Sequence, residues 1–263
     1  MKNNNSFPIR FVWLLAGLVI VLSARFAPSA ETDNKKGIVA FTEGDVKRQP
    51  PQVENWENAP IHTPVLSGDK VRTYLDSRAE LDLAQLDIVR LAPKTIIDIV
   101  KLYEETKEKK VQTQIQIQEG EIWANVHQIE MNTQFDIGAP LAAAAITGTV
   151  LRMKVEEDST TQLKVYHGEV RLYKPTQVQS PAKLGAPQQI PGPHTIEGPH
   201  AVGMNEWFAI VKSMQQITID KQGKVVSTGA FTPQDEDEKT KWIQWNQARD
   251  KARTRRLQDL KTK

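Results

Sequence analysis

Residues 37–174 alternate apolar and polar side chains with a period of two. This alternation is typical of strands that bury one face and expose the other. The clearest case is residues 111–118, VQTQIQIQ, where valine, threonine and isoleucine share one face and glutamines occupy the other. Shorter examples lie at 81–83, 89–91, 97–99, 151–156 and 163–165. Because no stretch of this region follows a helical period for more than one or two turns, the pattern predicts an all-β domain.

Turn-forming residues separate the alternating segments. The predicted turns are Glu43-Gly44-Asp45, Ser67-Gly68-Asp69, Glu119-Gly120-Glu121, Glu157-Asp158-Ser159 and His167-Gly168-Glu169. Their spacing predicts many short strands, arranged in a solenoid-like stack or a sandwich. The run 141–145 (LAAAA) fits either a single helical turn or a flat strand packed closely against another backbone.

The first 29 residues resemble a signal peptide. Lys2 and Arg10 precede an apolar run over 11–22, and small residues follow that run. A run of this length is shorter than the roughly 20 residues that a membrane-spanning helix needs. We therefore expect export, with cleavage after Ser29 and a periplasmic or secreted mature protein. Arg25 lies just past the apolar run, so an uncleaved membrane anchor remains the alternative.

The composition changes after residue 174. The predicted organisation is a signal peptide at 1–29, an all-β domain at 30–174, a Pro/Gly-rich linker or strap at 175–200, a short β-hairpin extension at 201–233 and a basic C-terminal helix at 234–263. The helix offers Trp242, Trp245, Ala248, Ala252 and Leu260 for burial. We expect the two tryptophans to dock on the β-domain, with contact to a membrane surface or polyanion as the alternative.

Charge and cysteine content exclude several classes of function. The chain has 34 basic and 32 acidic residues, and removal of Lys2, Arg10 and Arg25 leaves 31 basic residues against 32 acidic ones. Such a balance argues against nucleic-acid binding, which needs many phosphate-neutralising cations. The absence of cysteine excludes disulfides, thiolate metal sites and cysteine nucleophiles.

Catalytic motifs are not found in the sequence. There is no phosphate-binding glycine-rich loop, no Gly-x-Ser-x-Gly and no His-Glu-x-x-His. His194 and His200 recur in a Gly-Pro-His pair within the linker, where two exposed histidines on a rigid loop are the simpler interpretation than a metal site. We therefore expect no enzyme activity, no cofactor and no metal, with a cell-wall glycan hydrolase as the least favoured alternative.

Two groups of residues are candidates for a binding surface. The polar face of the 111–118 strand carries Gln112, Gln114 and Gln116, which can bind a glycan or another strand through hydrogen bonds. The terminal helix carries Arg253, Arg255 and Arg256.

The middle of the chain resembles the FecR domain. The matching segments are Gly37–Val39, Gly68–Thr73, Ser77–Leu81, Ile88–Thr95, Glu119–Trp123, Ala144–Thr149 and Val165–Val170, with departures at Asp87 and Thr147. The resemblance implies an all-β, non-catalytic domain outside the cytoplasm.

Sensor members of this family carry a cytoplasmic segment that acts on a sigma factor, ahead of a membrane helix. Only about ten residues precede the apolar run here, so we expect an exported, stand-alone FecR-domain protein rather than a direct sigma regulator. The predicted function is binding or scaffolding in the cell envelope, with an envelope protein or a cell-wall polysaccharide as partner. A membrane-anchored extracytoplasmic sensor is the main alternative, in which residues 1–29 would provide the membrane contact.

Overall fold

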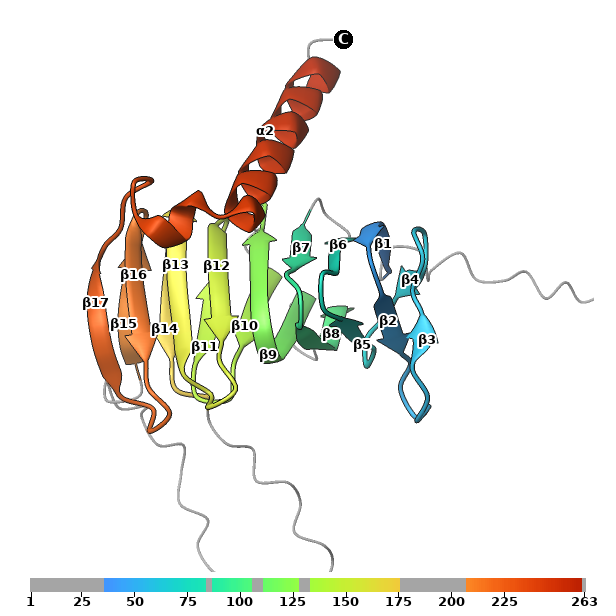
Figure 1. Cartoon of the computed structure of the whole chain (residues 1–263), viewed down its shortest axis with the longest axis horizontal. Coiled ribbons are helices and arrows are strands. Elements are labelled where there is room, and N and C mark those ends of the chain that lie inside the picture. Colours follow the sequence, from blue (N-terminus) through green and yellow to red (C-terminus); the bar gives the residue numbers. More distant parts are fainter. Residues whose placement is uncertain (1–35, 84–86, 106–110, 128–132, 176–206, 262–263) are drawn as a thin grey trace, which may run out of the picture. The chain divides into compact units, whose positions relative to one another are not determined.

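Two β-sheets that share one long strand make up most of the structure (Figure 1). The computed structural model describes residues 36–83, 87–105, 111–127, 133–175 and 207–261. The predicted signal peptide and the predicted linker with His194 and His200 lie outside the described residues.

The described residues form seventeen strands. Sheet A has the order β4 (Pro64–Val65), β1 (Gly37–Glu43), β6 (Arg78–Asp82), β7 (Ile88–Leu91), β9 (Val111–Asn125), β12 (Val150–Val155), β13 (Thr161–His167), β16 (Gln215–Ile219) and β17 (Val225–Ala230). Sheet B has the order β3 (Glu57–Asn58), β2 (Val46–Gln49), β5 (Lys70–Thr73), β8 (Ile96–Glu105), β9, β10 (Thr133–Gly138), β11 (Ala143–Ile146), β14 (Glu169–Tyr173) and β15 (Trp207–Lys212). Among these pairings only β9–β10 is parallel.

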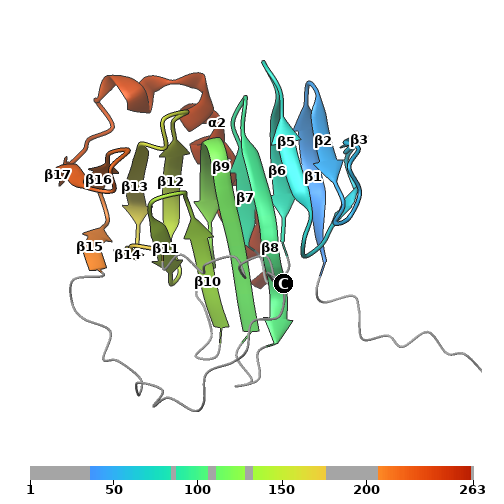
Figure 2. The ribbon, with the colours of Figure 1, turned by 90° about the horizontal axis from the view of Figure 1, so that it is seen from below.

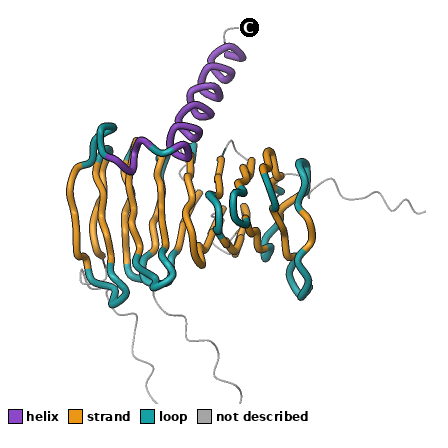
Figure 3. The backbone as a smooth tube through the Cα atoms, in the orientation of Figure 1, coloured by secondary structure: helices purple, strands orange, loops and turns teal. Residues whose placement is uncertain are grey.

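The chain passes repeatedly from one sheet to the other as it advances along the stack, as Figure 3 shows for the strand backbone. It forms β1 in sheet A, β2 and β3 in sheet B, β4 in sheet A, β5 in sheet B, β6 and β7 in sheet A, and then β8 in sheet B. This winding combines the two predicted arrangements, since each advance resembles a solenoid turn while the layers form a sandwich. The predicted all-β fold with a C-terminal helix is confirmed.

Strand β9 belongs to both sheets, and the predicted turn at Glu119-Gly120-Glu121 is wrong. Residues 111–119 pair with β8 in sheet B, and residues 120–125 pair with β12 in sheet A. The backbone bends at Gly120, where φ is +95° and an added Cβ would lie 2.5 Å from Thr95 Cα. Glycine is therefore needed for the close approach to Thr95, the residue that precedes β8, and the chain bends there without reversing.

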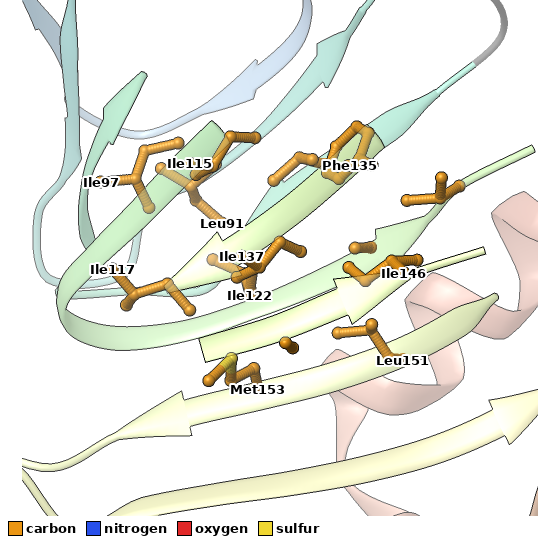
Figure 4. Close-up of a cluster of buried hydrophobic side chains, with 14 of the residues drawn as sticks. Leu91, Ile97, Ile115, Ile117, Ile122, Phe135, Ile137, Ile146, Leu151 and Met153 are labelled. Carbon is orange, nitrogen blue, oxygen red and sulfur yellow. The ribbon is translucent and has the colours of Figure 1, made fainter. Parts of the chain in front are cut away.

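The hydrophobic core fills the layer between the two sheets. Figure 4 shows side chains from both sheets that point toward one another in this layer. Leu91, Ile122, Leu151 and Met153 come from sheet A, and Ile97, Ile115, Ile117, Phe135, Ile137 and Ile146 come from sheet B. All are nearly inaccessible to solvent, so the period-two pattern predicted the inward faces correctly.

A C-terminal segment packs on the outer face of sheet A. It contains a 3-10 helix, η5 (Glu236–Lys239), and an α-helix, α2 (Lys241–Lys261), whose far end extends beyond the strands in Figure 1. In Figure 2, α2 lies behind the strands of sheet A. Trp242 and Trp245 are half-buried and stack with ring centroids 5.5 Å apart.

The buried positions of α2 differ from those predicted. Ala248 and Ala252 are exposed, while Ile243 and Asn246 are buried. The helix is mostly polar and meets sheet A along a narrow stripe that includes Ile243, Asn246 and Asp250, so the two alanines on its other side face solvent. No described helix is both long and apolar enough to cross a membrane.

The structure also shows the conformation of the LAAAA run, of the extension after the linker and of Asp87. The LAAAA run leads into β11, so the flat-strand interpretation is correct. The extension after the linker contains the β16–β17 hairpin and also β15, which pairs with β14 and extends sheet B. Asp87, a departure from the FecR pattern, is buried and accepts hydrogen bonds from the Tyr103 hydroxyl and the His127 amide.

Candidate functional site

The glutamine row lies on the outer face of sheet B, in the half of β9 that precedes Gly120. Alternate residues Thr113, Ile115 and Ile117 point into the core and are buried. The intervening Gln112, Gln114 and Gln116 are half-buried, and Gln118 is exposed. The three candidate glutamines therefore share one face, but neighbouring strands shield them more than the sequence predicted.

The two ends of the glutamine row are held by charged neighbours. Lys101 Nζ donates to Gln112 Oε1 at 2.8 Å, and Gln118 Nε2 donates to Asp98 Oδ2 at 2.8 Å. The middle side chains, Gln114 and Gln116, make no hydrogen bond with another described residue. Two amides thus remain available in the centre of the row.

Gly138 of β10 leaves room for the Gln116 side chain in the centre of the glutamine row. It lies opposite Gln116 in the parallel β9–β10 pair. A Cβ at this position would lie 2.1 Å from Gln116 Oε1. The Gln116 side chain therefore occupies the space above the glycine, and any larger residue would displace it.

Asp136 is a site residue that the sequence analysis missed. It lies opposite Gln114 on β10, and it is buried although its side chain is on the outer face. Gln134 Nε2 donates to its Oδ2 at 2.6 Å, whereas its Oδ1 is buried with no hydrogen-bond partner. Burial raises the pKa of this carboxyl, against the opposing effect of hydrogen bonds from Gln134 and Tyr173. A carboxylate at an outward position of β10 was a signal that could have identified it.

The side chains of this face offer hydrogen bonds to a ligand. Successive glutamines on one face of a strand are about 6.6 Å apart, because each residue advances about 3.3 Å. Each amide presents a carbonyl acceptor and two N–H donors. The row can therefore hold a ligand that repeats hydroxyl or amide groups along its length.

The three candidate arginines lie on α2, on the sheet A side of the sandwich, whereas the glutamine row lies on sheet B. Arg253 is half-buried, with Nη1 3.8 Å from Asp82 Oδ2, while Arg255 and Arg256 are exposed on α2. Arg256 borders a hollow of about 120 Å³ together with Arg90 and Arg249. Since α2 packs on sheet A and the glutamines lie on sheet B, the two groups do not form a single surface.

A buried ionic cluster joins η5 to sheet A. Lys164 Nζ lies 2.6 Å from Asp237 Oδ2 and 2.9 Å from Glu238 Oε1. The Tyr166 hydroxyl donates to Glu238 Oε2 at 2.8 Å. Burial raises the pKa of Asp237, but hydrogen bonding and charge attraction from Lys164 outweigh it, and the pKa is lowered overall.

A second ionic cluster joins α2 to sheet A. Arg90 is only 1% exposed and lies 2.6 Å from Glu80 and 2.8 Å from Asp250. Trp123 Nε1 donates to Asp250 Oδ2 at 2.8 Å. Sequence reasoning assigned these outward-facing polar residues to solvent and missed their burial, because their partners lie far along the chain.

A groove of about 810 Å³ runs between the C-terminal segment and the rim of the sheets near Gly120. Its walls carry charges of both signs, among them Lys94, Lys154, Glu119 and Glu157. Across the described ranges, no group of three His, Asp or Glu side chains is placed to hold a metal ion.

Comparisons with known proteins find a family model that is similar to part of the chain. Residues 69–171 match the model of the family described as FecR protein. No curated protein matches the chain.

Two crystal structures of a candidate anti-sigma factor from Parabacteroides distasonis, at 1.65 and 2.50 Å resolution, are similar to the chain at 13% sequence identity and a TM-score of 0.43. The similarity covers 61% of this chain and 59% of that chain. The strands from β5 to β13, which include the glutamine row, and most of β14 lie in the segment that matches the FecR model.

Proposed function

We propose that this protein is a non-catalytic binding protein of the cell envelope, which uses the glutamine row to bind cell-wall polysaccharide. The observation that carries the proposal is the pair Gln114 and Gln116, two half-buried amides without a described hydrogen-bond partner. Half-buried polar groups without partners are costly unless a ligand or water satisfies them. A polysaccharide offers repeated hydroxyls that can both donate and accept.

The location of the protein is part of the proposal. The sequence of residues 1–29 supports export, and the FecR domain supports a place outside the cytoplasm. The mature protein would then be periplasmic or secreted, where polysaccharide is available. An envelope protein is the other partner that fits a hydrogen-bonding strand surface.

The test is co-sedimentation of the purified protein with isolated cell-wall polysaccharide. The double variant Gln114→Glu, Gln116→Glu adds two charges to the row and removes two N–H donor groups, and we expect it to weaken binding at least tenfold. Gln247→Glu makes a matched change at an exposed position of α2 and should leave binding unchanged. Equal binding by both variants and the natural protein would show that the row is not the site.

Two further measurements separate the alternatives. Release of soluble sugar during the same incubation would indicate a hydrolase rather than a binding protein. Mass spectrometry of the native N-terminus distinguishes export from anchoring, because loss of residues 1–29 fits a free protein and their retention fits a membrane-anchored sensor.

A further inference from the structure

Asp136 lies beside the glutamine row, and its carboxylate is only partly satisfied. The residue is 6% exposed, and Gln134 Nε2 donates to its Oδ2 at 2.6 Å. The other oxygen, Oδ1, is buried without a hydrogen-bond partner. A buried polar atom of this kind costs free energy unless a partner from outside the chain satisfies it. Asp136 therefore marks a place where a ligand can make a contact that the protein does not make for itself.

The carboxylate of Asp136 also lacks a counter-ion. It forms no ion pair with a described residue. Lys101 lies across Gln114 from it, and its Nζ donates to Gln112 at 2.8 Å. Burial and the neighbouring charge of Asp136 raise the pKa of Tyr173 to about 12, so the tyrosine stays neutral and adds no positive charge. The negative charge of Asp136 is thus buried with little compensation.

Asp98 provides a contrast on the same face of sheet B. It lies opposite Gln116 on β8, the strand on the other side of β9 from β10. Its Oδ2 accepts a hydrogen bond from Gln118 Nε2 at 2.8 Å, and its Oδ1 lies 4.0 Å from Lys70 Nζ. Asp98 therefore has both a hydrogen-bond donor and a positive neighbour within the chain, whereas Asp136 leaves one oxygen and its charge for a ligand.

The residues next to Asp136 on β11 are small. Antiparallel pairing places Ala145 opposite Asp136 and Ala143 opposite Gly138, and residues opposite each other share a face of the sheet. The outward side chains of β11 are therefore two methyl groups. On the other side, Gln114 makes no hydrogen bond with a described residue and is able to turn aside. A ligand group on this face can thus come close to Oδ1.

We propose that Asp136 selects the ligand of the glutamine row, and that this ligand is a polysaccharide of amino sugars whose free amino groups bind as ammonium. The inference rests on the function proposed for the row and names the class of polysaccharide. One ammonium would donate to Oδ1 and would also supply the missing counter-ion. The hydroxyls of the same polymer would bind Gln114 and Gln116. A neutral hydroxyl can donate to Oδ1 as well, but it leaves the buried charge uncompensated.

Calorimetric titration with three oligosaccharides of equal length tests the selection. They consist of glucosamine, N-acetylglucosamine or glucose, in a mildly acidic buffer that keeps the amines protonated. The natural protein should bind the glucosamine oligomer about tenfold more tightly than the other two, because a charge-assisted hydrogen bond is stronger than a neutral one.

Asp136→Asn should remove this preference. The new side chain would turn its oxygen toward the Gln134 donor, and its amide N–H groups would then face the ligand amine. Asp98→Asn is the matched control, since it removes the same charge from the same face and should keep the preference. Circular dichroism checks that both variants retain the strand content of the natural protein.

Equal affinity for the three oligomers, or a preference for glucosamine that survives in Asp136→Asn, would overturn the inference. The double variant Gln114→Glu, Gln116→Glu distinguishes this result from a failure of the proposed function. If the double variant weakens binding of the glucose oligomer while Asp136→Asn changes no preference, the row binds polysaccharide and only the selection by Asp136 is wrong. If the natural protein binds neither the oligomers nor cell-wall polysaccharide, both proposals are wrong.

Discussion

Arg249 donates two hydrogen bonds to Glu80, from Nε to Oε2 at 2.7 Å and from Nη2 to Oε1 at 2.7 Å. Glu80 Oε2 also accepts from Arg90 Nε at 2.6 Å. One carboxylate on β6 thus holds a buried arginine of the sheet and an arginine of α2. The helix buries few apolar side chains, so charged contacts provide much of its attachment to sheet A.

The variant Glu80→Gln should destabilise the protein by about 3 kcal/mol, because the loss of one carboxylate leaves the buried positive charge of Arg90 only partly compensated. Urea unfolding followed by tryptophan fluorescence measures the change. Glu43→Gln is the control, since Glu43 pairs with Arg78 at an exposed position and should cost less than about 1 kcal/mol. Equal effects of the two variants would contradict a special role for Glu80.

Acid should loosen the attachment of α2. Burial raises the pKa of Glu80, but hydrogen bonds from Arg249 and Arg90 outweigh it and hold the pKa below its usual 4.5. The stabilising effect is therefore complete above about pH 4.5 and is lost as the pH falls through the folded-state pKa. Fluorescence of Trp242 and Trp245 during an acid titration should change in that lower range. Glu80→Gln should remove part of this pH dependence.

Gly120→Ala should destabilise the protein by about 3 kcal/mol, since the new Cβ would collide with Thr95 at a positive φ. Thermal unfolding followed by circular dichroism measures the effect. Gly223→Ala tests the contribution of φ alone, because φ is +76° there and the Cβ position is open. We expect that control to lower the free energy of unfolding by about 1 kcal/mol. Similar losses at both positions would mean that the contact with Thr95 is unimportant.

Asp136→Asn should stabilise the protein at pH 7. Burial raises the pKa of Asp136, so the folded state disfavours its charged form. The natural protein therefore becomes more stable, relative to its own stability at pH 7, as the pH falls toward the folded-state pKa. The variant lacks this charge, and its advantage should disappear in acid. Melting temperatures of both proteins between pH 3 and about 8 measure the difference. Asp76→Asn, at an exposed position, is the control and should leave the melting temperature at pH 7 nearly unchanged.

Sequence patterns predicted several elements well. The alternation at 111–118 correctly placed Ile115 and Ile117 in the core and the glutamines on the opposite face. The tryptophans of α2 lie against the β-domain, where Trp245 contacts Phe41 with ring centroids 5.5 Å apart. These are local properties, because the side-chain period of a strand and the composition of a helix are set by neighbouring residues.

Other features had no local signal. Residues 119–121 look like a turn, yet β9 continues through Gly120, because pairing with β8 on one side and β12 on the other keeps the chain extended. Arg90 and Lys164 look like solvent-facing strand residues, yet both are buried beneath the C-terminal segment. Their burial depends on carboxylates of η5 and α2, which no window of the β-domain sequence contains.

By itself, the sequence determined the all-β class, the inward faces of the strands and the presence of a terminal helix. Each follows from side-chain periodicity, which acts over a few residues. Only the tertiary structure decided which polar face is covered and where one strand joins two sheets. Those outcomes depend on contacts between residues far apart in the chain, such as Glu80 with Arg249, and such contacts exist only once the sheets have assembled.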